Sequence, residues 1–260
     1  MSLLATLAAN LFLFLGTLVF SIGALLGVLL PPRGHWPLRC AVWWSRGWLA
    51  SARVRLEVEI EDEAAEALRS EGPFVFVANH QSLLDIPVLL AALPGPPQIL
   101  AKRSLFRIPV FGQALAAAGF VPVDRGDRAR AGEAFAGALR HLEQGRSVLV
   151  FPEETRSATG RVLPFKRGAL LMAVRAGAPL APIGVFGTRT IQAKGSLTVR
   201  PGVVTVRIGP PRPARLGSPA QRRALLEALR ADVVRLSGMA AENAEVDDAA
   251  EREPGLGEPR

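Results

Sequence analysis

Tyrosine is absent from this 260-residue chain, cysteine occurs once and histidine occurs three times. The single cysteine, Cys40, excludes a disulfide within the chain. Three histidines and one cysteine do not make up the usual ligand set of a structural zinc ion, so we expect no metal site and no other cofactor. No G-x-S-x-G sequence occurs, which excludes the nucleophile elbow of a serine hydrolase.

Lysine is also scarce, yet the chain is strongly basic. The formal net charge is +8 and the pI is about 11.1, with arginine supplying most of the positive charge. Such a charge attracts nucleic acid, phosphate-bearing substrates or an acidic lipid surface. Bases are usually bound by aromatic side chains interleaved with basic ones, but no tryptophan follows Trp48. A membrane-tethered nucleic-acid binder is therefore only a distant alternative, and we expect no nucleic-acid partner.

Charge is missing altogether between Ser2 and Leu30. A helix needs about 20 apolar residues to cross the hydrocarbon layer of a membrane, and this run is long enough. A cleaved signal peptide has a basic start and a shorter apolar stretch, so we expect a membrane anchor instead. Arginines follow at positions 33, 39, 46, 53 and 55. By the positive-inside tendency they predict that the rest of the chain lies on the cytoplasmic side of the cell inner membrane.

All four tryptophans lie in the next segment, between Trp36 and Trp48. They share one broad sector of a helix, and arginines spaced by seven lie beside that sector. Tryptophan prefers the headgroup layer and arginine binds phosphate, so the pattern favours an amphipathic interfacial helix lying on the bilayer. A helix that packs into the protein core is the alternative. The two segments can also form a hairpin that enters one leaflet without crossing. Together they form a predicted membrane-anchoring region, residues 1–53.

From Val54 onward the pattern alternates between strands and helices. Strands are expected at Val54–Ile60, Phe74–Ala78, Phe120–Asp124, Ser147–Pro152, Ala181–Gly187, Ser196–Gly202 and Val203–Gly209. Helices are expected at Pro87–Leu93, Phe111–Gly119, Arg128–Gln144, Arg167–Ala176 and Pro219–Leu236. This order predicts an α/β fold with a mostly parallel sheet flanked by helices, in one domain over residues 54–238. Residues 239–260 are small, acidic or Gly/Pro, which predicts a disordered acidic tail.

One pair of residues suggests acid–base chemistry. His80 follows a predicted buried strand, and Asp85 lies five residues further on. If the intervening residues form a turn, the Asp85 carboxylate can bind one ring nitrogen of His80, which fixes the tautomer and leaves the other nitrogen free to accept a proton. In the alternative interpretation, Ser82 and Asp85 form a helix capping box and Asp85 is only structural.

Further polar side chains lie near the ends of other predicted strands. They are Lys102, Arg103, Asp124, Arg125, Glu153, Thr155 and Arg156. Because the carboxyl ends of parallel strands share one edge of a sheet, we expect these side chains to converge near His80. Two arginines opposite a general base predict a substrate that carries phosphate, since the guanidinium fork binds phosphate oxygens in pairs.

Six blocks in order, "NHQSLLD", "AKRSLFRIPVFG", "GFVPVDR", "FPEETRS", "PFKRGA" and "APLAPIGVF", resemble the glycerolipid acyltransferase family that carries the H-x4-D motif, in particular its 1-acyl-sn-glycerol-3-phosphate acyltransferases of the PlsC type. The resemblance runs from about Phe74 to Gly187. It implies that His80 is the general base and that Asp85 orients it. It also implies substrate-binding roles for residues of the later blocks, namely Arg125, Glu153, Thr155 and Arg156, with Lys102 in support. The last block, around Pro182, is associated with the acyl donor or acyl chain.

The resemblance implies transfer of an acyl group from a thioester, acyl-CoA or acyl carrier protein, to the sn-2 hydroxyl of 1-acyl-sn-glycerol 3-phosphate, which gives phosphatidic acid. The expected partners are lysophosphatidic acid, the acyl donor and membrane lipid. One position departs from the family pattern, because Glu154 stands where glycine is usual. Glycine permits backbone conformations that glutamate resists, and an added negative charge repels phosphate. Another lysophospholipid or an acyl-amino-acid lipid is therefore the alternative acceptor.

Overall fold

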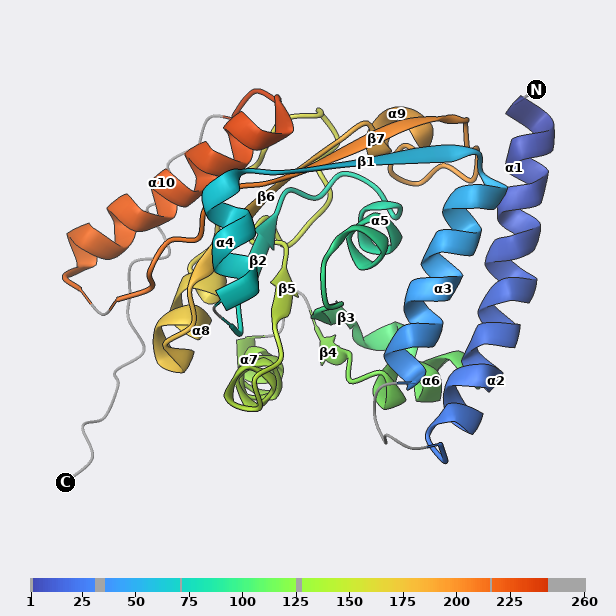
Figure 1. Cartoon of the computed structure of the whole chain (residues 1–260), viewed down its shortest axis with the longest axis horizontal. Coiled ribbons are helices and arrows are strands. Elements are labelled where there is room, and N and C mark those ends of the chain that lie inside the picture. The colour runs from blue at the N-terminus through green and yellow to red at the C-terminus, as the bar shows by residue number, and fades with distance from the viewer. Residues whose placement is uncertain (1, 31–35, 71, 125–127, 216, 243–260) are drawn as a thin grey trace.

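The computed structural model describes residues 2–30, 36–70, 72–124, 128–215 and 217–242. Its centre is a seven-stranded sheet in the order β1-β7-β6-β2-β5-β3-β4 (Figure 1). Every neighbouring pair is parallel except β6 and β7, which run antiparallel. The predicted α/β fold with a mostly parallel sheet is confirmed.

The strands of this sheet are short. They are β1 (Val54–Ile60), β2 (Val75–Ala78), β3 (Gln98–Lys102), β4 (Val121–Val123), β5 (Val148–Val150), β6 (Leu180–Phe186) and β7 (Gly202–Ile208). Helices precede, connect and follow them. They are α1 (Ser2–Leu11), η1 (Phe12–Gly16), α2 (Thr17–Gly27), α3 (Trp36–Ser51), α4 (Asp62–Ser70), α5 (Asp85–Ala92), η2 (Arg103–Arg107), α6 (Phe111–Ala117), α7 (Arg128–Glu143), α8 (Gly168–Ala176), α9 (Thr188–Ile191) and α10 (Pro219–Ser237).

Alternate residues of β2 serve two hydrophobic cores, one on each face of the sheet. Phe76 and Ala78 belong to the core that also holds side chains of α3 and α5, while Val75 and Val77 belong to the core with α7, α8 and α10. All four residues of β2 are buried. Because β2 is apolar on both faces, it lies in the middle of the sheet, and the residue pair that follows it is held at a central position.

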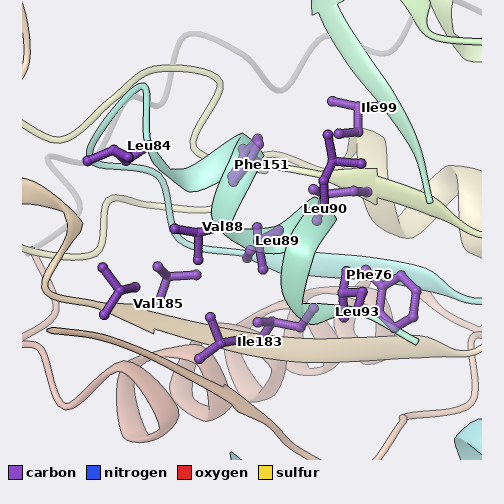
Figure 2. Packing of buried hydrophobic residues seen from close by; sticks show 14 of the residues in the cluster. Phe76, Leu84, Val88, Leu89, Leu90, Leu93, Ile99, Phe151, Ile183 and Val185 are labelled. Carbon is purple, nitrogen blue, oxygen red and sulfur yellow. The ribbon is translucent and has the colours of Figure 1, made fainter. Parts of the chain in front are cut away.

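Helix α5 is fixed against the first of these cores. Val88, Leu89 and Leu90 of α5 belong to this core together with Phe76 of β2 and Ile183 of β6 (Figure 2). All five side chains are at most 2% exposed. Burying a side chain of this size contributes about 1.5–3 kcal/mol, so the α5 contacts hold the start of this helix firmly against the sheet.

The N-terminal apolar run forms one continuous helix through α1, η1 and α2, in which η1 is a π-helical turn. Its stretch Leu3–Gly27 is long and apolar enough to cross a membrane. This helix runs alongside the body of the protein, next to α3 and α6 (Figure 1). At its start, the Thr6 hydroxyl donates to the backbone oxygen of Val199 over 2.8 Å, and the Asn10 amide donates to that of Leu197 over 3.0 Å.

The tryptophan-rich segment is helix α3, and its two faces differ. Trp48 is 2% exposed and belongs to the protein core, whereas Trp43 is 46% exposed. Trp44 stacks on Trp48 and donates its indole N–H to the hydroxyl of Thr17 in α2 over 3.1 Å. The core-packing interpretation therefore holds for one face of α3, and the exposed Trp43 remains available for the interfacial role.

Several sequence-based expectations about local structure are wrong. The expected strand at Ser196–Gly202 is absent, because Val199 exchanges backbone hydrogen bonds with the Thr6 hydroxyl instead of a neighbouring strand. Helix α5 begins at Asp85 and not at Pro87, since proline is tolerated within the first turn of a helix. Strand β3 and helix α4 form where no element is expected.

At the carboxyl end, residues 239–242 are ordered against the body and do not begin a disordered tail. The backbone N–H of Val162 donates to the Ala240 oxygen, and that of Glu242 donates to the Val162 oxygen, both over 2.9 Å. The remainder of the expected acidic tail, 243–260, lies outside the described residues.

Candidate active site

The loop between β2 and α5 holds His80 against Asp85. Nδ1 of His80 lies 2.7 Å from Oδ2 of Asp85, and the two side chains are almost fully buried. A carboxylate can only accept, so the Nδ1–H donates and the ring keeps Nε2 as its free nitrogen. Within the described part of the chain, no other side chain or backbone group hydrogen-bonds this ring.

Asp85 also organises the loop itself. Oδ2 accepts the backbone N–H groups of Gln81 over 2.6 Å and Ser82 over 2.8 Å, in addition to the imidazole. The side chain stands at the first residue of α5, where the helix dipole favours a negative charge. The helix capping box is not formed, because the N-cap residue of α5 is Leu84 and no side chain caps it, whereas one carboxylate oxygen of Asp85 both shapes the turn and holds the ring.

Glu153 fixes the backbone of His80 from the neighbouring strand. It lies in the loop after β5, where Oε1 accepts the His80 N–H over 2.7 Å and Oε2 accepts the Leu163 N–H over 3.0 Å. Burial raises the pKa of Glu153 to about 7, while the two backbone donors oppose this rise. The Ser157 N–H donates to the His80 oxygen over 2.8 Å, so this loop binds both backbone groups of the histidine.

Asn79, Phe151 and Ser82, none of which is predicted as a site residue, also hold the loop. Asn79 donates to the Val185 oxygen over 2.9 Å and accepts the Val185 N–H over 2.8 Å, which ties the end of β2 to β6. The Phe151 ring stacks on the His80 imidazole with centroids 4.1 Å apart. The Ser82 hydroxyl donates to the Gln192 oxygen over 2.7 Å. Asn79 and Ser82 belong to the block "NHQSLLD", and their place in this block is the only signal in the sequence that could have indicated their role.

Three further predicted site residues, Lys102, Thr155 and Arg156, lie at the same edge of the sheet. Thr155 and Arg156 follow Glu153 in the β5 loop, and Lys102 ends β3. No ion pair engages Arg156 or Lys102 within the described ranges, so both cations are available to an anionic ligand. No contact between Lys102 and the His80–Asp85 pair occurs there either. Arg125 lies outside the described residues.

Arg103, by contrast, is committed to the protein. Its guanidinium lies 2.7 Å from Asp124 and 2.8 Å from Glu133. These two carboxylates raise its pKa further above the ordinary arginine value, with the Glu133 hydrogen bond the largest cause. Arg103 therefore connects the end of β3 to the neighbouring β4 and α7 and is not free to bind phosphate.

Glu154 adopts a backbone conformation that favours glycine. Its φ is +55°, in the left-handed region where side chains other than glycine are strained. Its carboxylate lies 2.9 Å from the ammonium of Lys166, and both side chains are well exposed. The glycine that the family usually has here thus matches the backbone, and glutamate adds strain together with a negative charge beside the site loop.

Residues 59–186 match a protein-family model that is described as "Acyltransferase". A chloroplast 1-acyl-sn-glycerol-3-phosphate acyltransferase of Brassica napus is 41% identical over 127 residues, which is 49% of this chain and 37% of the relative. The human 1-acyl-sn-glycerol-3-phosphate acyltransferase alpha is 35% identical over 177 residues, 66% of this chain and 62% of the relative. The match thus spans less than two thirds of either relative's own length.

A solved structure agrees over nearly the whole chain. The crystal structure of the 1-acyl-sn-glycerophosphate acyltransferase PlsC of Thermotoga maritima matches with a TM-score of 0.74 at 28% identity, covering 93% of this chain and 98% of that one. Residues 59–186 of this chain thus form a domain of the acyltransferase family.

Proposed function

We propose that this protein transfers a fatty acyl group from an acyl thioester to the sn-2 hydroxyl of 1-acyl-sn-glycerol 3-phosphate, producing phosphatidic acid. The observation that carries the proposal is the 2.7 Å contact between His80 and Asp85 at the carboxyl edge of the sheet. It supplies a general base with one nitrogen free, next to a loop whose Arg156 is available for a phosphate. The names of the relatives support the acceptor.

The proton moves through Nε2 of His80. As the acceptor hydroxyl attacks the thioester carbonyl, Nε2 takes its proton and the carbonyl carbon becomes tetrahedral. The C–S bond then breaks, and the imidazolium returns the proton to the departing thiolate. Asp85 stabilises the imidazolium between these steps and keeps the ring in place. The ester forms, the thiol leaves and His80 is regenerated.

Among the residues that the structure describes, no serine beside the dyad is suited to form an acyl-enzyme. Ser82 is fully buried, and its hydroxyl donates to Gln192 and accepts the Leu84 N–H. Ser157 is 1% exposed and its hydroxyl accepts the Gly160 N–H. A thioester is already activated, so direct attack by the acceptor needs no protein nucleophile.

Membrane association follows from the N-terminal helix. Its outward face carries large apolar side chains that are 44–71% exposed: Leu3, Leu4, Leu7, Leu11, Phe14, Leu15, Leu18, Val19, Ile22 and Leu26. An exposed apolar face of this size marks a surface that another apolar phase covers. Because the opposite face packs along the body, we propose that the helix lies in one leaflet of the bilayer. The arginines that follow the apolar run favour a position of the domain on the cytoplasmic side of the inner membrane.

The function is tested by supplying the purified full-length protein, in lipid vesicles, with lysophosphatidic acid and either acyl-CoA or acyl carrier protein. Phosphatidic acid should form with at least one of the donors. A panel of lysophosphatidylcholine, lysophosphatidylglycerol, glycerol 3-phosphate and an acyl-amino-acid lipid covers the alternative acceptors. Failure with lysophosphatidic acid and success with another acceptor would reject the proposed substrate while keeping the chemistry.

Arg156→Ala is expected to raise the KM for lysophosphatidic acid about 10- to 100-fold, because a hydrogen bond to a charged group contributes about 1.5–3 kcal/mol. The kcat should change less, since the dyad keeps all of its contacts. Steady-state kinetics in mixed micelles measure both constants. Arg69→Ala, which removes an exposed arginine from α4, is the matched control. An unchanged acceptor KM in Arg156→Ala would contradict the phosphate role.

Glu154 distinguishes the proposed acceptor from the alternative that carries no phosphate, an acyl-amino-acid lipid. Glu154→Gln removes the charge and Glu154→Gly also relieves the left-handed backbone, so both should lower the KM for lysophosphatidic acid by up to about tenfold. The glycine variant should in addition unfold at a higher temperature, since strain of this kind costs about 1–3 kcal/mol. If neither variant changes this KM and both lose activity on an acyl-amino-acid lipid, that lipid is favoured as the acceptor.

A further inference from the structure

Residues Met239–Glu242, which we name the C-terminal strap, add a short extended segment beside the loop that follows β5. Val162 pairs in parallel with Ala241 through two backbone hydrogen bonds of 2.9 Å. The Thr159 hydroxyl donates to the Glu242 carboxylate over 2.6 Å. Val162 itself is fully buried in the core under α10. The strap is therefore attached to a part of the β5 loop that is itself anchored.

The first residue of the strap contacts the catalytic loop directly. The Met239 sulfur accepts from the side-chain amide of Gln81 over 3.1 Å and from that of Asn79 over 3.5 Å. These two residues flank His80 in the sequence, and both are buried. Sulfur is a weak acceptor, but a thioether is also an apolar group that fills space. Met239 therefore covers the loop on both sides of the histidine.

Arg230 of α10 joins the strap to the backbone of the β5 loop. Its guanidinium donates to the oxygens of Val162 over 2.9 Å, Leu163 over 3.1 Å and Glu242. The Leu163 N–H donates in turn to Glu153, whose other oxygen accepts the His80 N–H. A continuous set of hydrogen bonds thus runs from α10 and the strap to the backbone of the catalytic histidine.

We infer that the C-terminal strap is a positioning element of the active site, in which Met239 and the Arg230 contacts hold the His80 loop in its reactive geometry. The inference rests on the proposed function. Residues 230–242 lie beyond the segment 59–186 that the family model matches, so the family motif alone does not account for them. A displacement of about 1 Å of a catalytic group can lower the rate by 10²-fold, which makes such support consequential.

Two truncations test the inference. Ending the chain after Glu242 keeps the strap, whereas ending it after Gly238 removes the strap and leaves α10 with its C-terminal cap. With lysophosphatidic acid as acceptor, the first truncation should keep wild-type kinetics. The second should lower kcat at least tenfold and leave the acceptor KM within about threefold, because the phosphate-binding arginine is untouched. Both are measured well below the unfolding temperature of each protein.

Met239→Ala and Met239→Leu provide a second test if the shorter truncation does not fold. Alanine leaves a void beside Asn79 and Gln81 and should lower kcat about three- to tenfold, whereas leucine fills the space and should keep most of the rate. Wild-type kcat in both the Gly238 truncation and Met239→Ala would overturn the inference, and so would a change in KM alone. An inactive full-length protein rejects the proposed function instead.

Discussion

His80→Ala should lower kcat for acyl transfer by about 10²–10⁴-fold, the range that general acid–base catalysis contributes. The substitution removes Nε2, and no other described titratable side chain lies within hydrogen-bonding distance of the imidazole except Asp85. The protein should still fold, because the contacts to Glu153 and Ser157 are made by the His80 backbone and remain. Acyl transfer is measured with excess donor and acceptor, alongside thermal unfolding and vesicle binding.

His141→Ala is the matched control for this experiment. It removes an imidazole of equal size from α7, and its side chain lies near Gly119 before β4 and away from the β2–α5 loop. The control should keep wild-type kcat even if it lowers stability slightly. A His80→Ala protein that folds, binds vesicles and retains more than one tenth of the wild-type kcat would show that another group abstracts the proton.

The dyad could be predicted from sequence because it depends on local chain geometry. A buried strand ending at Ala78 and a helix starting near Asp85 leave a short turn, and a short turn brings the carboxylate back to the ring. The parallel sheet could be predicted for the same reason, since alternating strands and helices admit few other arrangements. Both conclusions required only neighbouring residues and their periodicity.

The partners of Glu153 could not be predicted, because they come from segments far apart in the chain. Its place in the block "FPEETRS" associates it with the acceptor's phosphate, but the structure shows both oxygens bound to the backbone N–H groups of His80 and Leu163. The sequence shows that a carboxylate follows a strand, but it does not show which backbone N–H groups donate to that carboxylate. The same limit applies to Met239, whose small and acidic surroundings predicted disorder.

The contacts of Glu153 favour a role that differs from the one implied by the family resemblance. A carboxylate that is 4% exposed and already accepts two backbone donors has little capacity left for a ligand. Negative charge would also repel the acceptor's phosphate. We therefore treat Glu153 as a positioning residue that holds the backbone of His80.

Glu153→Gln is expected to lower kcat about 10- to 100-fold with an acceptor KM close to wild type, since glutamine can accept only one of the two N–H donors and turns its amide toward the other. Steady-state kinetics separate this result from a substrate-binding role, in which KM rises and kcat persists. Glu143→Gln is the control, because Glu143 lies exposed at the end of α7.

The pH dependence of stability provides an independent measurement on the same variant. Burial raises the pKa of Glu153 to about 7 from its ordinary value of 4.5. The folded protein therefore binds a proton that the unfolded chain releases, so the stabilising contribution is full below about pH 4.5 and is lost as the pH rises through 7. The wild-type free energy of unfolding should fall across this window, by roughly 3 kcal/mol at most, relative to Glu153→Gln.

Activity should change in the opposite direction, because only the ionised carboxylate accepts both N–H groups. Parallel stability curves for the two proteins between pH 4.5 and 7 would mean that folding does not raise the pKa of Glu153, and its effect on kcat would then come from hydrogen bonding alone.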